Sequence, residues 1–245
     1  TLDETILTNP DVFEGYHLKF CVLMQLKQYA KAETVLADAI AMFPKDPGFV
    51  MDRVTLLIEQ KKVDEALAVL TDLEQAEETD DSIRRRICRE RAQIYAGQEE
   101  IASAIASLNE AKALAEKAGE FDADVIFLLT NCYLSAGEYD KVLDYSRQLL
   151  EKSQDVYSRE TARYYIPLAL KLSGRMEEAL PLYRDAVNEF RGQSLASPGN
   201  LDAYLLRVLC LRDMEQYEKA LELLDYVITL QPEKAEPRLV RVTLL

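Results

Sequence analysis

The fold is decided by residues 16–44, which read YHLKFCVLMQLKQYAKAETVLADAIAMFP. In the second half of this stretch a small residue, Ala32, has apolar residues three positions before it and four and seven positions after it, at Tyr29, Leu36 and Ala39. Side chains with these offsets share one face of an α-helix. The spacing therefore predicts a helix of roughly 14 residues with a single apolar stripe.

The first half of the same stretch carries its own apolar stripe, marked by Phe20 and Leu23. The short polar link KQY separates the two stripes, and Pro44 follows the second one at a point where a helix should end. The stretch therefore predicts two antiparallel helices joined by a tight turn, which together form a helical hairpin.

The same hairpin pattern recurs along the chain. Ala32 has one equivalent in each of five later copies, and we call these six positions the marker residues. Successive markers are 34, 38, 38, 37 and 41 residues apart in the sequence. The five equivalents are Ala66, Ala104, Val142, Ala179 and Ala220. A small side chain at the marker lets the second helix approach the first closely. We therefore expect each marker between the two helices of its hairpin, with a looser contact at Val142.

The recurring pattern resembles the tetratricopeptide repeat, whose aromatic, Gly, Tyr, Ala, Ala and Pro signature is matched best by residues 16–44 and 204–232. That resemblance implies an all-α fold, a right-handed α-solenoid or superhelix of antiparallel helix pairs, with residues 1–245 in a single solenoid. The expected units are a half repeat at 1–10, full repeats near 13–46, 47–84, 85–122, 123–159, 160–200 and 201–234, and a partial repeat at 235–245.

The middle steps exceed the 34 residues usual in that family. They predict longer helices or loops at residues 74–82, 118–122 and 190–200. Because the last segment contains Gly192, Pro198 and Gly199, we expect a bend or a mobile connection there. Pro167 falls inside a predicted first helix and is expected to kink it.

Charge and composition narrow the class of partner. The chain has 49% hydrophobic residues and a net charge of −14. Such a surface repels phosphate backbones and anionic lipids, so we expect no nucleic-acid partner. No apolar run approaches the roughly 18 to 20 residues that span a bilayer, so we expect no membrane insertion.

The cellular location is predicted from the cysteines. Four widely spaced cysteines in no metal-ligand pattern indicate buried thiols and a reducing compartment, which favours the cytoplasm. The sequence begins with Thr1 rather than Met, which leaves room for a targeting segment ahead of it. This reasoning also leaves open that the chain is a fragment of a longer protein.

The residues that carry chemistry are few. His17 is the only histidine, so a nucleophilic triad could form only around it. There is no Gly-rich phosphate loop and no Cys-x-x-Cys or His-Glu-x-x-His motif. We therefore predict a protein that is not an enzyme and has no catalytic, cofactor-binding or metal-binding residue.

The predicted first helices carry the candidate binding residues. The segment SIRRRICRERAQ at 82–93 suits an acidic peptide, although its arginines equally neutralise the preceding acidic loop. Chaperone-binding members of the family hold a C-terminal carboxylate with Lys, Asn and Arg side chains. That clamp is matched only at its first pair, so chaperone tails are disfavoured. The candidates for a groove that binds a peptide or partner helix are Arg86, Arg89, Gln93, Phe127, Asn131, Tyr164 and Tyr165.

These observations predict a scaffold or adaptor that binds another protein in its concave groove. One alternative is the non-catalytic domain of a larger enzyme or signalling receptor. An RNA-binding helical repeat is disfavoured by the acidic net charge. End-to-end self-association is a further expectation, because a solenoid without polar caps leaves apolar end faces.

Overall fold

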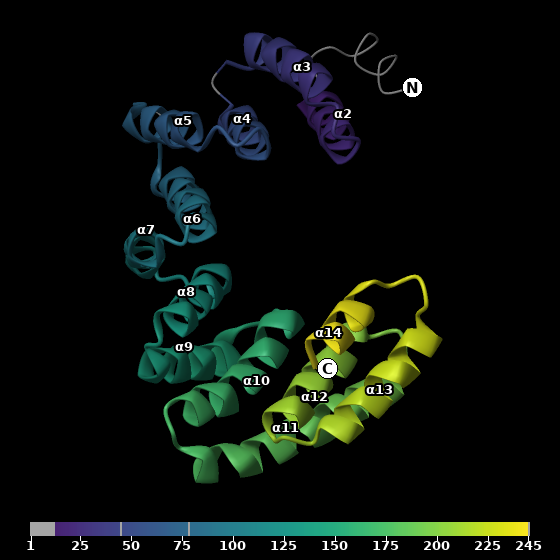
Figure 1. Cartoon of the computed structure of the whole chain (residues 1–245). Coiled ribbons are helices and arrows are strands. Elements are labelled where there is room, and N and C mark those ends of the chain that lie inside the picture. The colour runs from purple at the N-terminus through teal and green to yellow at the C-terminus, as the bar shows by residue number, and fades with distance from the viewer. Residues whose placement is uncertain (1–12, 45, 78, 245) are drawn as a thin grey trace. The chain divides into compact units, whose positions relative to one another are not determined.

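The computed structural model describes residues 13–44, 46–77 and 79–244, and every regular element in them is a helix (Figure 1). The helices are α2 (Phe13–Gln25), α3 (Tyr29–Met42), α4 (Pro47–Glu59), α5 (Val63–Gln75), α6 (Asp81–Gly97), α7 (Ile101–Lys117), α8 (Ala123–Ala136), α9 (Tyr139–Lys152), α10 (Val156–Leu172), α11 (Met176–Ala196), α12 (Leu201–Asp213), α13 (Tyr217–Leu230) and α14 (Glu236–Leu244). The expected half repeat at 1–10 lies outside the described residues.

The chain divides into two compact units, one ending at Lys117 and one beginning at Ala118. In the first unit α2 packs with α3, α4 with α5, and α6 with α7. In the second unit α8 packs with α9, α10 with α11, and α12 with α13, while α14 packs on α13. The expected all-α fold of helix pairs is confirmed. The assignment of the chain to one solenoid, with the repeat bounds given above, stays a prediction.

All six marker residues are fully buried. Each lies in the second helix of its pair, where a small side chain brings that helix close to the first. Val142 is as buried as the five alanines. One turn after it stands Ser146, where the other hairpins have Leu or Tyr, so a smaller neighbour offsets the larger marker.

The turn within each hairpin contains one residue in the left-handed backbone region, always five positions before the marker. Two of the six are glycines, Gly137 and Gly174. The other four are charged residues with φ between 55° and 63°, namely Lys27, Lys61, Glu99 and Glu215. Gly97, although it stands at the end of α6, is not the residue that makes the turn. The turn geometry is therefore set by the hairpin itself, and glycine is optional.

Most first helices begin at an acidic or amide cap. The side-chain oxygens of Asp46, Asp80, Asp122, Asp155 and Asn200 each accept a hydrogen bond from a backbone N–H in the first turn of α4, α6, α8, α10 and α12. These caps satisfy donors that would otherwise lack a partner. They fix where each first helix starts, and hence which of its side chains face outward.

The markers that are more than 34 residues apart are separated mainly by longer helices. α6, α7 and α10 have 17 residues and α11 has 21, against 13 or 14 in the other helices of the six pairs. The expected bend at 190–200 is wrong for its first part, because α11 continues through Gly192 to Ala196. Buried Phe190 and Ser194 hold that segment in the helix despite the glycine. α10 also runs on past Pro167, and the kink there stays a prediction.

Candidate functional site

The second unit presents aromatic and amide side chains on two successive first helices. Phe127 and Asn131 come from α8, and Tyr157 and Tyr165 come from α10; we call these four residues the α8–α10 surface. The rings of Phe127 and Tyr157 meet edge to face, with centroids 5.8 Å apart. The Tyr165 hydroxyl donates a hydrogen bond of 2.7 Å to Asn131 Oδ1. One apolar and one polar contact therefore join the two helices.

This surface offers groups that a polypeptide can use. Burial and the neighbouring Tyr157 raise the pKa of Tyr165, which keeps its hydroxyl a neutral donor to Asn131. Asn131 accepts this hydrogen bond through Oδ1, so its Nδ2 group is not used in it. Within the described chain the two Nδ2 hydrogens make no hydrogen bond and are available to a ligand. Tyr157 is 51% exposed. The surface thus combines amide donors with an exposed aromatic ring.

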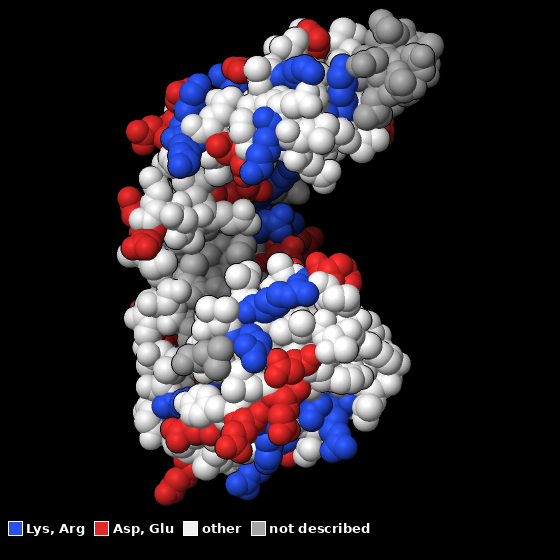
Figure 2. All heavy atoms as spheres, turned by 45° about the vertical axis from the view of Figure 1, so that its right-hand side comes forward, with Lys and Arg blue, Asp and Glu red and all other residues white. Residues whose placement is uncertain are grey.

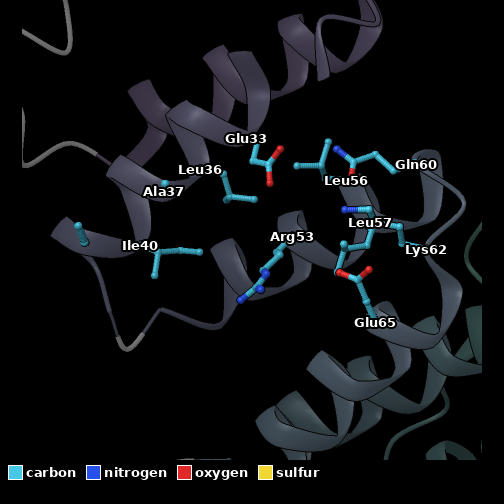
Figure 3. A pocket seen from close by; sticks show the side chains of 11 residues that line it. Glu33, Leu36, Ala37, Ile40, Arg53, Leu56, Leu57, Gln60, Lys62 and Glu65 are labelled. Atoms are coloured by element: carbon cyan, nitrogen blue, oxygen red, sulfur yellow. The ribbon is translucent and has the colours of Figure 1, made fainter. Parts of the chain in front are cut away.

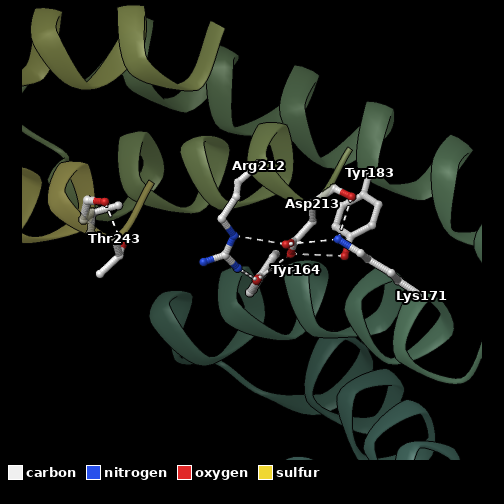
Figure 4. A network of polar contacts seen from close by, with 7 residues as sticks. Tyr164, Lys171, Tyr183, Arg212, Asp213 and Thr243 are labelled. Carbon is white, nitrogen blue, oxygen red and sulfur yellow. Dashed lines mark hydrogen bonds and ion pairs between the residues drawn. The ribbon is translucent and has the colours of Figure 1, made fainter. Parts of the chain in front are cut away.

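Tyr164 lies elsewhere, in the core of the second unit (Figure 4). Its hydroxyl donates to Asp213 Oδ2 at 2.8 Å and accepts from Arg212 Nη2 at 3.1 Å. Tyr183 also donates to the Asp213 carboxylate, and Lys171 Nζ donates to the Asp213 backbone oxygen at 2.8 Å. Burial and Asp213 raise the pKa of Tyr164. Tyr164 therefore ties α10 to α12, and its predicted role in binding receives no support from its position.

In the first unit the first helices carry a polar set. His17 Nδ1 of α2 lies 2.8 Å from Asp52 Oδ2 of α4, and the His17 ring stacks on Phe13 with centroids 5.7 Å apart. Burial raises the pKa of Asp52, while His17 and, more weakly, Arg86 of α6 act to lower it. The three first helices thus bring an imidazole, a carboxylate and a guanidinium to one neighbourhood.

Cys21 adds a thiol to this set. Its Sγ lies 3.7 Å from His17 Nε2, so thiol, imidazole and carboxylate follow in the order of a nucleophilic triad. However, burial and the charge of Asp52 raise the pKa of the Cys21 thiol, whereas an activated cysteine needs a lowered one. The arrangement is therefore poorly suited to covalent catalysis, and the absence of enzyme activity stays a prediction.

The cysteine prediction holds for three of the four residues. Cys88, Cys132 and Cys210 are buried free thiols, whereas Cys21 is only partly buried. Sequence spacing could not separate them, because the exposure of Cys21 depends on which helices pack beside α2.

The three candidates on α6 differ in exposure. Arg86 and Gln93 are exposed, while Arg89 is partly buried. Arg89 has interactions within the protein, so it is not a free guanidinium. The positions of these three residues do not define a binding site for a particular ligand. Their role in binding stays a prediction.

The alternative interpretation of the arginine cluster is confirmed in part. Arg91 pairs with Glu74 of α5, and Arg84 lies 3.9 Å from Asp81 at the start of the same helix. These two arginines therefore neutralise nearby carboxylates.

A cleft of about 440 Å³ lies between α3, α4 and α5 in the first unit (Figure 3). Its apolar floor comes from the first two of these helices, through Leu36, Ile40, Leu56 and Leu57. Charged side chains of both signs surround the floor, including Glu33, Arg53 and Glu65. The cleft could take an apolar side chain, but its mixed rim selects no charge.

Basic side chains accompany the acidic ones on the surface (Figure 2). Figure 2 shows Lys and Arg beside Asp and Glu on the visible face of each unit. In the described part of the chain, no helix has both the length and the apolar content to cross a bilayer.

The family model of the tetratricopeptide repeat matches residues 23–85. That segment carries tetratricopeptide repeats. This agrees with the in-phase marker residues, which continue the same hairpin beyond the matched segment. Among curated proteins, none matches the chain in sequence.

Solved structures share the tetratricopeptide fold over most of the chain. A tetratricopeptide repeat protein from Parabacteroides merdae is 18% identical with a TM-score of 0.60, covering 89% of this chain and 79% of that one. The C-terminal part of a repeat protein from Cytophaga hutchinsonii is 13% identical with a TM-score of 0.61, covering 96% and 90%. A chain of the APC/C hetero-tetramer Cut9–Hcn1 is 11% identical with a TM-score of 0.63, covering 100% and 45%. At these identities the likeness shows the fold alone.

Tyr157 of the α8–α10 surface was not predicted from the sequence. The repeat phase places the start of the fifth repeat near residue 160, but the cap at Asp155 starts α10 at Val156. The available signal was Asp155 three positions before Ser158, because an aspartate there can cap a helix. Its carboxylate accepts a hydrogen bond from the Ser158 N–H. Asp52 was missed for another reason, because its partner His17 lies 35 residues away in the chain.

Proposed function

We propose that this tetratricopeptide repeat protein is a scaffold that binds another polypeptide, as an extended peptide or a partner helix, on the outward faces of its first helices. The observation that carries this proposal is the α8–α10 surface. Its four side chains come from two successive first helices and contact each other across them. Two neighbouring repeats thus present one continuous set of groups.

The chemistry of this surface suits a polypeptide. The Nδ2 group of Asn131 can donate to a backbone carbonyl of an extended segment. Phe127 and Tyr157 offer aromatic area for an apolar side chain of the same segment. Proteins with this repeat typically mediate protein–protein interactions, and the similar Cut9–Hcn1 chain comes from a hetero-tetramer. Both points support a protein partner rather than a small substrate.

Self-association is a second candidate that one observation favours. Leu239 and Val242 of α14 are 65% and 73% exposed, which is high for apolar side chains on one helix face. Sedimentation over a concentration series tests it. A constant monomer mass would contradict it. The cytoplasmic location and the membership of a larger enzyme or receptor stay predictions.

The binding proposal is tested with a polypeptide selected from a displayed peptide library against the whole chain. The affinity of that ligand is compared between the unmodified protein and the variants Phe127→Ala and Asn131→Ala. We expect each variant to weaken binding by about tenfold, since each removes one contact type of about 1.4 kcal/mol.

The matched control is Tyr217→Ala, which removes an exposed aromatic ring from α13, a second helix. It should leave the affinity unchanged. The unfolding midpoint of every variant is measured alongside, because Phe127 is partly buried. Unchanged affinity in both folded α8 variants would contradict the proposal.

A further inference from the structure

Two arginines lie side by side where α11 meets α12. The Tyr204 hydroxyl of α12 donates to the Ser194 carbonyl of α11 at 3.4 Å, which fixes the register of these consecutive helices. The helices run antiparallel, so one turn forward on α12 lies opposite one turn back on α11. Those positions are Arg207 and Arg191. One further turn along, Leu211 and Val187 belong to the same apolar cluster, as this register requires.

Neither guanidinium has a protein partner in the described chain. Arg191 is exposed, and no ion pair or side-chain hydrogen bond joins it to another residue. Arg207 is partly buried, and its Nε is fully buried without an acceptor. A buried N–H that lacks an acceptor is costly, so a ligand that supplies one would bind favourably.

Among the residues that the structure describes, no carboxylate acts on the pKa of Arg207. Burial and the charge of Arg191 lower the pKa of Arg207, and the only group that acts to raise it is the Tyr204 phenol. The nearby carboxylate of Glu189 lies 3.9 Å from Arg163 instead. In a chain with a net charge of −14, two adjacent arginines without a carboxylate are an exception to the general surface.

Aromatic side chains flank the pair. Tyr204 stands one turn before Arg207, and its ring lies 6.1 Å from that of Tyr226 of α13. Tyr226 is exposed, so its ring and hydroxyl are accessible from solvent. The pair therefore has an aromatic wall on one side, formed by Tyr204 and Tyr226.

We propose that Arg191 and Arg207 form a binding site for the phosphoryl group of a phosphomonoester. Guanidinium groups bind phosphate oxygens through paired N–H donors. The Nε of Arg207, buried and without an acceptor in the ligand-free chain, supplies one of them when the side chain turns toward the phosphoryl group. A phosphomonoester carries about −1.5 to −2 charges, which matches two guanidinium groups, whereas one carboxylate would leave half of that charge unbalanced. The site does not depend on the α8–α10 surface.

The test follows the arginine Nε–Hε signals of the whole chain by NMR while phenyl phosphate is added. We expect a saturable shift of the Arg207 signal. Arg191→Gln and Arg207→Gln should each weaken binding by about tenfold, because each removes charge-assisted hydrogen bonds. Arg184→Gln is the matched control, since Arg184 is exposed on the same helix α11. It should bind as the unmodified protein does.

The ligand class and its source are separated by three further probes. Benzoate should bind at least about tenfold more weakly than phenyl phosphate, since it carries one charge instead of two. A phosphotyrosine peptide that binds more tightly than phenyl phosphate would identify a phosphorylated polypeptide as the source. Equal affinity would identify a free small phosphomonoester. No saturable shift, equal binding of benzoate, or unchanged affinity in both folded arginine variants would overturn the proposal.

Discussion

At the scale of single residues, Asp213 organises the interior of the second unit. Its carboxylate accepts hydrogen bonds from Tyr164, Tyr183 and Arg212, and Lys171 lies 3.4 Å from it (Figure 4). These donors come from α10, α11 and α12. A buried carboxylate is stable only with such partners, so the network specifies how the three helices pack.

We predict that Asp213→Ala lowers the free energy of unfolding by about 3 kcal/mol, because the phenols and cations around it lose their common acceptor. The matched control is Asp225→Ala, which breaks the exposed pair with Arg241. It should cost less than about 1 kcal/mol. Urea denaturation measures both, and equal costs would show that the network adds little.

Glu160 is a buried carboxylate of the opposite character. Burial and the negative charge of Asp202 raise its pKa, with smaller contributions from Glu189 and Asp155, while Arg163 opposes them. A raised pKa in the folded state means that ionisation destabilises the fold. The stability that the protonated form contributes is complete below the ordinary pKa of 4.5 and is lost as pH rises through the folded pKa.

We therefore predict that Glu160→Gln makes the protein more stable at pH 7, with a gain that disappears as pH falls below about 4.5. Unfolding free energies measured from pH 4 to pH 8 check this. A variant that is less stable at pH 7 would mean that the attraction of Arg163 exceeds the cost of burial.

At the scale of the element, each hairpin has a first helix, capped in five of the six, then a left-handed turn residue five positions before the marker. The second helix begins three positions before the marker. The last feature is the one most visible in the sequence, since the marker and its stripe are local. The caps were missed because Asp80 belongs to an acidic run that reads as a solvated loop, yet it accepts from the Ile83 N–H.

The turn residues give a prediction for the hairpin. Lys61 has φ of 61°, a conformation in which glycine is less strained than lysine. Lys61→Gly should raise the free energy of unfolding by about 0.5 to 1 kcal/mol. Thermal denaturation measures the change.

The reverse substitution at an equivalent turn is the control. Gly137→Ala should lower stability by about 1 kcal/mol. A Cβ at this position meets only Tyr139 at ordinary contact distance, so the cost would come from the backbone and not from a clash. If both substitutions changed the free energy of unfolding in the same direction, backbone strain at the left-handed turn residue would not determine the stability of the hairpin.

At the scale of the whole molecule, six hairpins in phase made the fold predictable, because every repeat restates the same local pattern. The candidate site was predictable only in part. Phe127, Asn131 and Tyr165 were predicted from their positions on first helices, and Asn131 and Tyr165 contact each other; their role in binding stays a prediction. Tyr164 has the same kind of position but bonds to Asp213, 49 residues away, and no local pattern reveals such a partner.

The binding of a polypeptide on the α8–α10 surface is tested most directly by photo-crosslinking. A photoreactive p-benzoylphenylalanine replaces Tyr157 of the α8–α10 surface in one variant and Tyr217 of α13 in another; both native side chains are exposed. The account predicts crosslinks to the bound polypeptide from position 157 and none from position 217. Crosslinks from position 217 alone would contradict it and place the partner on the second helices.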